Sequence, residues 1–158
     1  MVLSNAERFG KVLDFHSFGQ ETLWAYNCAN HPWQLFMQAT AIVLSQASGY
    51  GNANRQPSAE GEHYEWQFQR GGFAHLQEIG TAFQPTFASA QAEAAAVYGA
   101  VFSMLSTPIH LTGHVTDACS GAALAATVQF QGVSFPYWST FTSGGGFGRY
   151  DVHPPPGN

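Results

Sequence analysis

The chain has 158 residues, of which 45% are hydrophobic and only 9% are charged, and its formal net charge is −5. The hydrophobic fraction excludes a disordered chain, and the five basic residues form no cluster, which argues against nucleic acid or an anionic membrane as a partner. No apolar run reaches the roughly 18–20 residues that a transmembrane helix needs.

The first hundred residues alternate short apolar runs with helical patterns. Apolar runs too short for a helix predict three strands, over 11–18, 22–26 and 73–79. The first of them is predicted to be buried. Capping residues and helical spacing predict three helices: from Asn30-His31-Pro32 to Gly49, over 62–70, and along the Ala-rich segment after Thr86 or Ser89. We expect Val97, Val101 and Leu105 to form one face of the last helix. Strands that alternate with helices predict an α/β sheet.

The pattern changes at Thr107-Pro108, after which short β-like runs are separated by turn residues. We therefore expect an α/β domain over 1–106 and a small all-β sandwich over 107–158. Cys28 and Cys119 fall in different predicted domains. Two unpaired thiols are the simpler interpretation, and the sequence leaves a disulfide open.

His16 ends one predicted strand and Glu78 ends another. Functional sites of open α/β sheets lie at the carboxyl ends of strands. A neutral imidazole is the commonest side-chain metal ligand, and a carboxylate beside a metal-bound water can take its proton. Two ordinary alternatives stay open on these residues alone: a histidine satisfied within the core, and a glutamate that serves as a cap or ion-pair partner.

His75-Leu76-Gln77-Glu78 has the form His-x-x-Glu, which is also the form of a zinc-binding pair. Residues three apart on a β-strand point to opposite faces of the sheet. If this segment is a strand, as its apolar pattern predicts, His75 and Glu78 cannot hold one ion together.

Several segments follow one another in the order and spacing of a known family: His16-Ser17-Phe18-Gly19, Leu23–Tyr26, Glu65-Trp66, Glu78-Ile79-Gly80 and Phe83-Gln84-Pro85. Together they resemble the C-terminal half of the zinc-dependent carboxypeptidases. The resemblance implies a partial mixed sheet with zinc as cofactor and the C-termini of peptides or proteins as substrate. It assigns His16 as a zinc ligand, Ser17 and Phe18 to the substrate cleft, and Glu78 as the general base.

The chain departs from that family's pattern in several places. Phe18 stands where tyrosine is more usual, Glu65 replaces an aspartate, and no tyrosine matches the one that closes over substrate. The family's first zinc motif, its oxyanion arginine and its anchor for the substrate carboxylate all precede the zinc histidine, and only fifteen residues precede His16. We therefore expect a fragment that lacks the N-terminal half of the peptidase domain and is inactive alone.

Residues 1–10 lack the charged start and apolar core of a signal peptide. The resemblance nevertheless implies a secreted or periplasmic parent protein.

The tail carries a second resemblance. Gly113–Asp117, Ser120–Leu124 and Ala126–Val128 are similar to the regulatory-like, transthyretin-like β-sandwich that is often appended to these peptidases, here incomplete at its C-terminal end. An alternative function is a non-catalytic protein whose β-sandwich binds a protein or a glycan, with the α/β part as a pseudo-peptidase scaffold.

Overall fold

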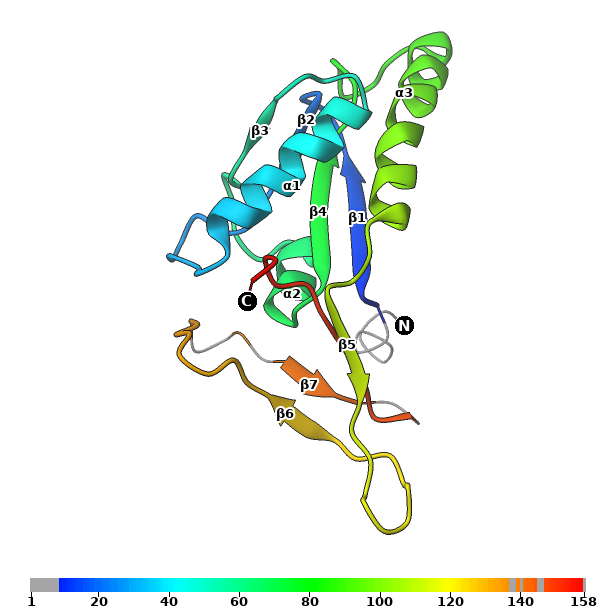
Figure 1. Cartoon of the computed structure of the whole chain (residues 1–158). Coiled ribbons are helices and arrows are strands. Elements are labelled where there is room, and N and C mark those ends of the chain that lie inside the picture. The colour runs from blue at the N-terminus through cyan, green and yellow to red at the C-terminus, as the bar shows by residue number, and fades with distance from the viewer. Residues whose placement is uncertain (1–8, 137–138, 140, 145–146, 158) are drawn as a thin grey trace.

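The computed structural model describes residues 9–136, 139, 141–144 and 147–157 (Figure 1). Residues 1–8, which make up most of the N-terminal segment without signal-peptide features, therefore lie outside the described residues. The described elements are β1 (Lys11–His16), β2 (Glu21–Leu23), α1 (Gln34–Ala47), β3 (Asn54–Arg55), α2 (His63–Gln69), β4 (Phe73–Glu78), α3 (Phe87–Ser106), β5 (Leu111–His114), β6 (Ala126–Val128), β7 (Phe141–Ser143) and β8 (Arg149–Val152).

The main sheet contains four strands in the order β1-β4-β2-β3. β1 runs parallel to β4, β2 runs antiparallel to β4, and β3 runs parallel to β2. With helices on both faces, this mixed sheet places the chain in the general α/β class. The expectation that β1 is buried is wrong, because β1 is an edge strand whose residues are half-buried or exposed.

The side chains of successive β4 residues point to opposite faces of the sheet, as the two-residue period of a strand requires. Phe73 packs in one buried cluster with Leu44 of α1 and with Met104 of α3. Leu76 belongs to a second buried cluster, which includes Phe68 of α2. Helices α1 and α3 therefore cover one face of the sheet, and α2 covers the other.

The first helix begins later than predicted. Trp33 rather than Asn30 precedes α1, and the ring Nδ1 of His31 accepts a hydrogen bond from the Trp33 amide at 3.2 Å. Residues 31–34 thus form a turn, in which the amide of Gln34 donates to the His31 carbonyl oxygen at 3.1 Å, and it leads into the helix. The predicted start of α3 is confirmed, since the Thr86 hydroxyl oxygen accepts the amide of Ser89 at 3.2 Å.

The expected buried face of α3 is only partly right. Val97 is buried, but the side chains that accompany it inward are Ala100 and Met104, whereas Leu105 is 64% exposed. The reason is close contact between helices, because a Cβ on Gly99 would lie 2.0 Å from the Ala47 carbonyl oxygen. Gly99 and Ala100 allow this close approach, and Leu105 lies outside the contact.

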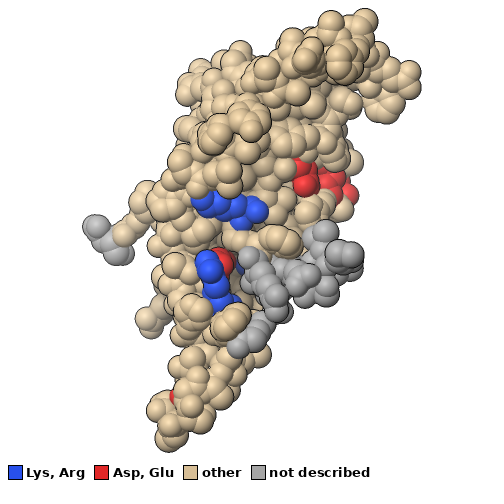
Figure 2. Space-filling view, turned by 90° about the vertical axis from the view of Figure 1, so that its right-hand side faces the viewer, with Lys and Arg blue, Asp and Glu red and all other residues tan. Residues whose placement is uncertain are grey.

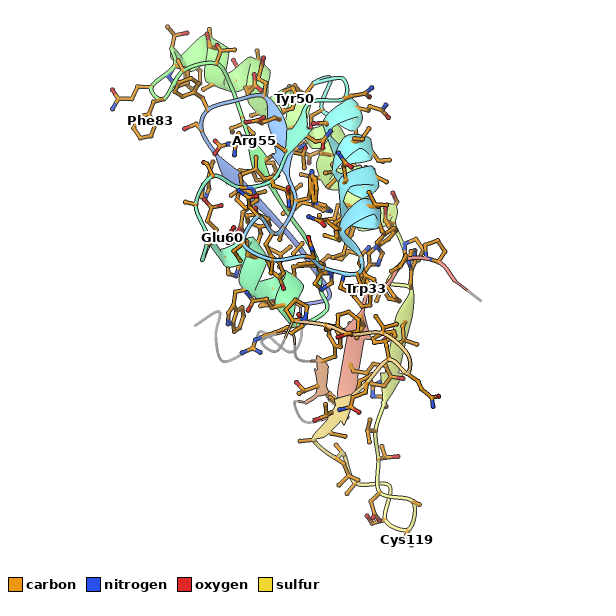
Figure 3. All side chains as sticks on the ribbon, turned by 90° about the vertical axis from the view of Figure 1, so that its left-hand side faces the viewer. Trp33, Tyr50, Arg55, Glu60, Phe83 and Cys119 are labelled. Carbon is orange, nitrogen blue, oxygen red and sulfur yellow. The ribbon has the colours of Figure 1, made fainter. Side chains whose placement is uncertain are left out.

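The β part consists of two antiparallel pairs, β5 with β8 and β6 with β7. It does not stand apart from the main sheet, because Phe141 and Val152 lie in the same buried cluster as Tyr26 and Leu23. Cys119 lies at the tip of the β part, far from the sheet (Figure 3). Cys28 and Cys119 are both exposed and unpaired.

The surface shown in Figure 2 carries little charge, in small basic and acidic areas, and one of the basic areas adjoins acidic atoms. Among the described residues, no helix is both long and apolar enough to cross a membrane.

Candidate functional site

The structure brings His16 and Glu78 together. The two residues are register partners at the carboxyl ends of the adjacent parallel strands β1 and β4. The amide of Ile79 donates a hydrogen bond to the His16 carbonyl oxygen at 2.7 Å, which extends the pairing past the strand ends. Register partners on parallel strands share a face, so both side chains lie on the face covered by α2.

Glu78 is the more unusual of the two residues. Burial raises the pKa of its carboxyl, and the charges on His16 and Arg55 lower it again, but the net change is upward. Its Oε2 atom is buried and has no hydrogen-bond partner among the described residues. The carboxyl group therefore has one acceptor oxygen left unsatisfied, and the burial of that oxygen favours the protonated form.

The loop after β1 crosses directly over Glu78. The amide of Gly19 donates to the carbonyl oxygen of Gly80 at 3.1 Å. A Cβ on Gly19 would lie 2.9 Å from the Cβ of Glu78 and 3.0 Å from Oε1 of Glu21. Glycine is therefore required at this position for the loop to approach the carboxylate so closely.

Arg55 is a second group, after His16, whose positive charge lowers the pKa of Glu78, and it comes from the short strand β3 (Figure 3). Its Nε donates to Glu21 Oε1 at 2.7 Å, and its Nη1 donates to the Gln56 carbonyl oxygen at 3.1 Å. Glu62 and Glu21 both raise the pKa of Glu78 by their charge. The site is therefore polar, with acidic groups in excess.

Ser17 and Phe18, the two predicted cleft residues, follow His16 directly. Ser17 lines a cavity of about 180 Å³ together with the segment Ile79–Ala82, Pro85 and three residues of α3: Ser89, Ala90 and Glu93. The Phe18 side chain is 54% exposed. Neither His16 nor Glu78 lines this cavity, which lies on the α3 side of the sheet. The role of Ser17 and Phe18 in binding substrate stays a prediction.

His75 has the structural role that its strand position predicts. It is fully buried on the α1 side of the sheet, where its ring nitrogens lie 3.2 Å from the Leu23 carbonyl oxygen and 2.9 Å from the Thr40 hydroxyl. Burial lowers its pKa to about 4. His75 and Glu78 therefore face opposite sides of β4 and do not form a metal-binding pair.

A second perturbed carboxyl lies at the start of α2. Glu65 is buried, and its Oε2 accepts the amides of Gly61 at 2.6 Å and Glu62 at 3.0 Å. Burial and the neighbouring Glu60 raise its pKa to about 7. Tyr64 beside it is completely buried, so it lines no accessible pocket in this structure. Its hydroxyl has no hydrogen-bond partner within the described part of the chain.

Within the described residues, no three side chains of His, Cys, Asp or Glu are grouped so that they can hold one metal ion. Catalytic zinc usually has three protein ligands and a water. His16 thus supplies at most one of the ligands that such a site needs. Comparison with protein-family models, curated proteins and solved structures finds no match.

Sequence reasoning missed Glu93, which lies at the same end of the sheet as His16 and Glu78. Glu93 accepts hydrogen bonds from the Tyr50 hydroxyl and from the Gln20 side-chain amide. One signal for it was available, because Glu93 is the only charged residue in the 20 residues of α3. A single carboxylate in an Ala-rich helix needs a partner, and the sequence alone gave no means of finding it.

Proposed function

We propose that this chain is the C-terminal part of a zinc carboxypeptidase catalytic domain, followed by a β-sandwich segment. In this proposal Glu78 is the general base and His16 is one of the zinc ligands. The observation that carries the proposal is the register of β1 and β4, which sets His16 beside Glu78 at the carboxyl ends of two parallel strands. The substrate class is a peptide or protein with a free C-terminus.

The chemistry of Glu78 is consistent with this role. A general base works best when its pKa lies near the operating pH, and burial moves the pKa of Glu78 upward in that direction. Its Oε2 has no hydrogen-bond partner but is buried, so in this proposal the bound substrate and water must reach that oxygen before it takes a proton from the water and passes it to the leaving amine. A zinc ion, when bound, lowers the pKa of its water toward about 7 and so supplies the nucleophile.

The described residues do not fit a complete zinc site, because they contain no group of three metal ligands. In this proposal the other ligands, the oxyanion arginine and the anchor for the substrate carboxylate come from the N-terminal half of the domain. The chain alone is then expected to release no C-terminal residues from peptides. Clear release by the purified chain would overturn this part of the proposal.

A zinc titration followed by NMR tests the role of His16 directly. Signals of the His16 ring should shift first as zinc is added, and the binding should be weak because one ligand contributes. His16→Ala should remove the effect, whereas His114→Ala should not, since His114 is an exposed histidine of β5. Equal shifts at His16 and His114, or no shift at His16, would contradict the proposed ligand role.

One observation favours the alternative of a binding protein. Phe130, Phe135 and Phe141 line an open depression of about 420 Å³ beside β6 and β7, together with Val133 and Pro136. Aromatic side chains at such a surface can contact the apolar groups of a protein or the faces of sugar rings. Glycan or protein binding that Val133→Asp abolishes, while His16→Ala leaves it unchanged, would favour this second function.

A further inference from the structure

Helix α3 has no charged outward face. A helix at the surface of a globular domain normally turns charged and polar side chains toward water. The only charged residue of α3 is Glu93, and its carboxylate accepts hydrogen bonds from Tyr50 and Gln20 of the same chain. Figure 2 looks onto the side of the molecule that carries α3, and the upper part of that view shows only uncharged residues. The outward face of α3 therefore has the composition of a face that other protein covers.

Six exposed apolar residues follow one another along this face at helical spacing, and we call them the outer row. The outer row consists of Phe87, Ala90, Ala94, Tyr98, Phe102 and Leu105. The rings of Tyr98 and Phe102 pack edge to face with their centroids 5.1 Å apart, yet the two residues are 61% and 60% exposed. A contiguous apolar patch of this kind on a folded chain marks an interaction surface.

The outer row is complementary to itself. Its six positions are three, four, four, four and three residues apart, so the spacing is the same from either end of the helix. If two copies of α3 pack antiparallel about the middle of the row, Tyr98 of one copy faces Ala94 of the other. Phe102 then faces Ala90, and Leu105 faces Phe87. Large side chains meet small ones at four of the contacts, as interdigitating helices require, and the two helix dipoles are opposed.

The area of the outer row matches what a dimer needs. The 20 residues of α3 form a helix about 30 Å long. Phe87 is 83% exposed, and together with Tyr98 and Phe102 it offers about 400 Å² per chain, since a buried aromatic side chain covers roughly 150–250 Å². Each partner of a standard interface buries about 800 Å², so three residues supply about half of that area before Leu105 and the flanking residues are counted. No other described element lies outside α3 in Figure 1, which leaves the row open to a second copy.

We propose that two copies of this chain form a symmetric dimer through the outer row of α3. The partner is a second copy rather than a different protein because one row supplies both the large and the small positions of an antiparallel contact. The proposal is independent of the proposed peptidase function. α3 covers the opposite face of the sheet from His16 and Glu78, so dimerisation leaves that pair uncovered.

Sedimentation equilibrium of the purified chain over a range of concentrations tests the dimer. The mass should rise from 17.1 kDa to twice that value and fall again on dilution. Leu105→Glu should raise the dissociation constant at least about 100-fold, because each dimer would lose two buried leucines and place two charges against Phe87. Leu35→Glu is the matched control, since Leu35 is an exposed leucine of α1 and should not affect the mass. Circular dichroism checks that both variants fold.

A swap of two residues tests the antiparallel contact itself. Ala94→Tyr should weaken the dimer, because two bulky rings then meet where one ring met a methyl group. The double variant Ala94→Tyr/Tyr98→Ala should restore the dimer, since every such contact again joins one large and one small residue. General stickiness of an apolar surface predicts the reverse, because the single variant adds aromatic surface.

Several results would overturn the proposal. The chain would then stay monomeric over the whole concentration range, or its dimer would survive Leu105→Glu, which would place the contact elsewhere, such as the free edge of β1. Stronger association of Ala94→Tyr, or no recovery in the double variant, would refute the antiparallel contact. If Leu105→Glu does not fold, the swap decides the question. Failure of the zinc titration would refute the ligand role of His16 and leave the dimer unaffected.

Discussion

Acid should unfold this protein because three histidines are buried in neutral form. Burial lowers the pKa of His31 to about 4, of His75 to about 4 and of His153 to about 3, from an ordinary value of 6.5. The unfolded chain binds a proton on each of these rings below about pH 6.5, whereas the folded chain does not. Their contribution to stability is therefore complete above pH 6.5 and is lost as the pH falls toward 4.

One carboxyl acts in the opposite direction. Burial and Glu60 raise the pKa of Glu65 to about 7 from 4.5, so the folded chain holds a proton there that the unfolded chain releases. Near pH 5.5, three imidazoles take up protons on unfolding and one carboxyl loses one, a net uptake of about two. Each proton corresponds to about 1.4 kcal/mol per pH unit, so the free energy of unfolding should fall by about 3 kcal/mol from pH 6 to pH 5. The raised pKa of Glu78 reduces this slope somewhat.

Urea unfolding followed by tryptophan fluorescence, at half-unit steps between pH 5 and pH 7, measures the slope. His75→Gln should lower the slope by about 1.4 kcal/mol per pH unit, since one of the three imidazoles is gone. The variant is also expected to be less stable at every pH, but that changes the level of the curve and not its slope. A free energy of unfolding that stays constant or rises on acidification over this range would refute the reasoning.

Two further changes test the packing. Gly99→Ala should destabilise the chain by about 1–3 kcal/mol in urea unfolding despite the better helix propensity of alanine, because the new methyl group meets the Ala47 carbonyl. The control is Ala95→Gly, at an exposed position of α3, which should cost about 1 kcal/mol. A smaller loss for Gly99→Ala than for Ala95→Gly would count against the close helix contact. Phe141→Ala should lower the free energy of unfolding by about 3–5 kcal/mol, because Phe141 is buried between the β part and the sheet. Phe83→Ala, at a side chain that is 71% exposed, should leave the melting temperature nearly unchanged. Equal effects of the two substitutions would contradict the shared core.

The strands and helices of the α/β part were largely predictable, because their signals are local. An apolar run ends at His16, a capping threonine begins α3 at Thr86, and the resulting elements follow. The meeting of His16 and Glu78 at one end of the sheet was expected from the rule that sites lie at strand ends, whereas the direct pairing of their two strands was not. The edge position of β1 and the outward turn of Leu105 depend on which neighbours are present, and no local pattern contains that information.

The polar contacts of the site were the least predictable feature. Glu93 and Gln20 are 73 residues apart, and their hydrogen bond exists only because α3 starts beside the carboxyl ends of β1 and β4. The burial that raises the pKa of Glu65 comes from the packing of α2. Both effects arise from the assembled fold, so sequence reasoning could name the acids but not their partners.

The core shared by the sheet and the β part has a consequence for how the protein is made. Phe141 closes the cluster that contains Tyr26, and the amide of His153 donates to the Gly71 carbonyl oxygen at 2.8 Å, so contacts that complete the core span much of the chain. Chains dominated by such distant contacts fold slowly. During synthesis, the aromatic cluster stays incomplete until the segment that contains Phe141 and His153 has left the ribosome. Until then the nascent chain exposes apolar surface of the kind that promotes aggregation.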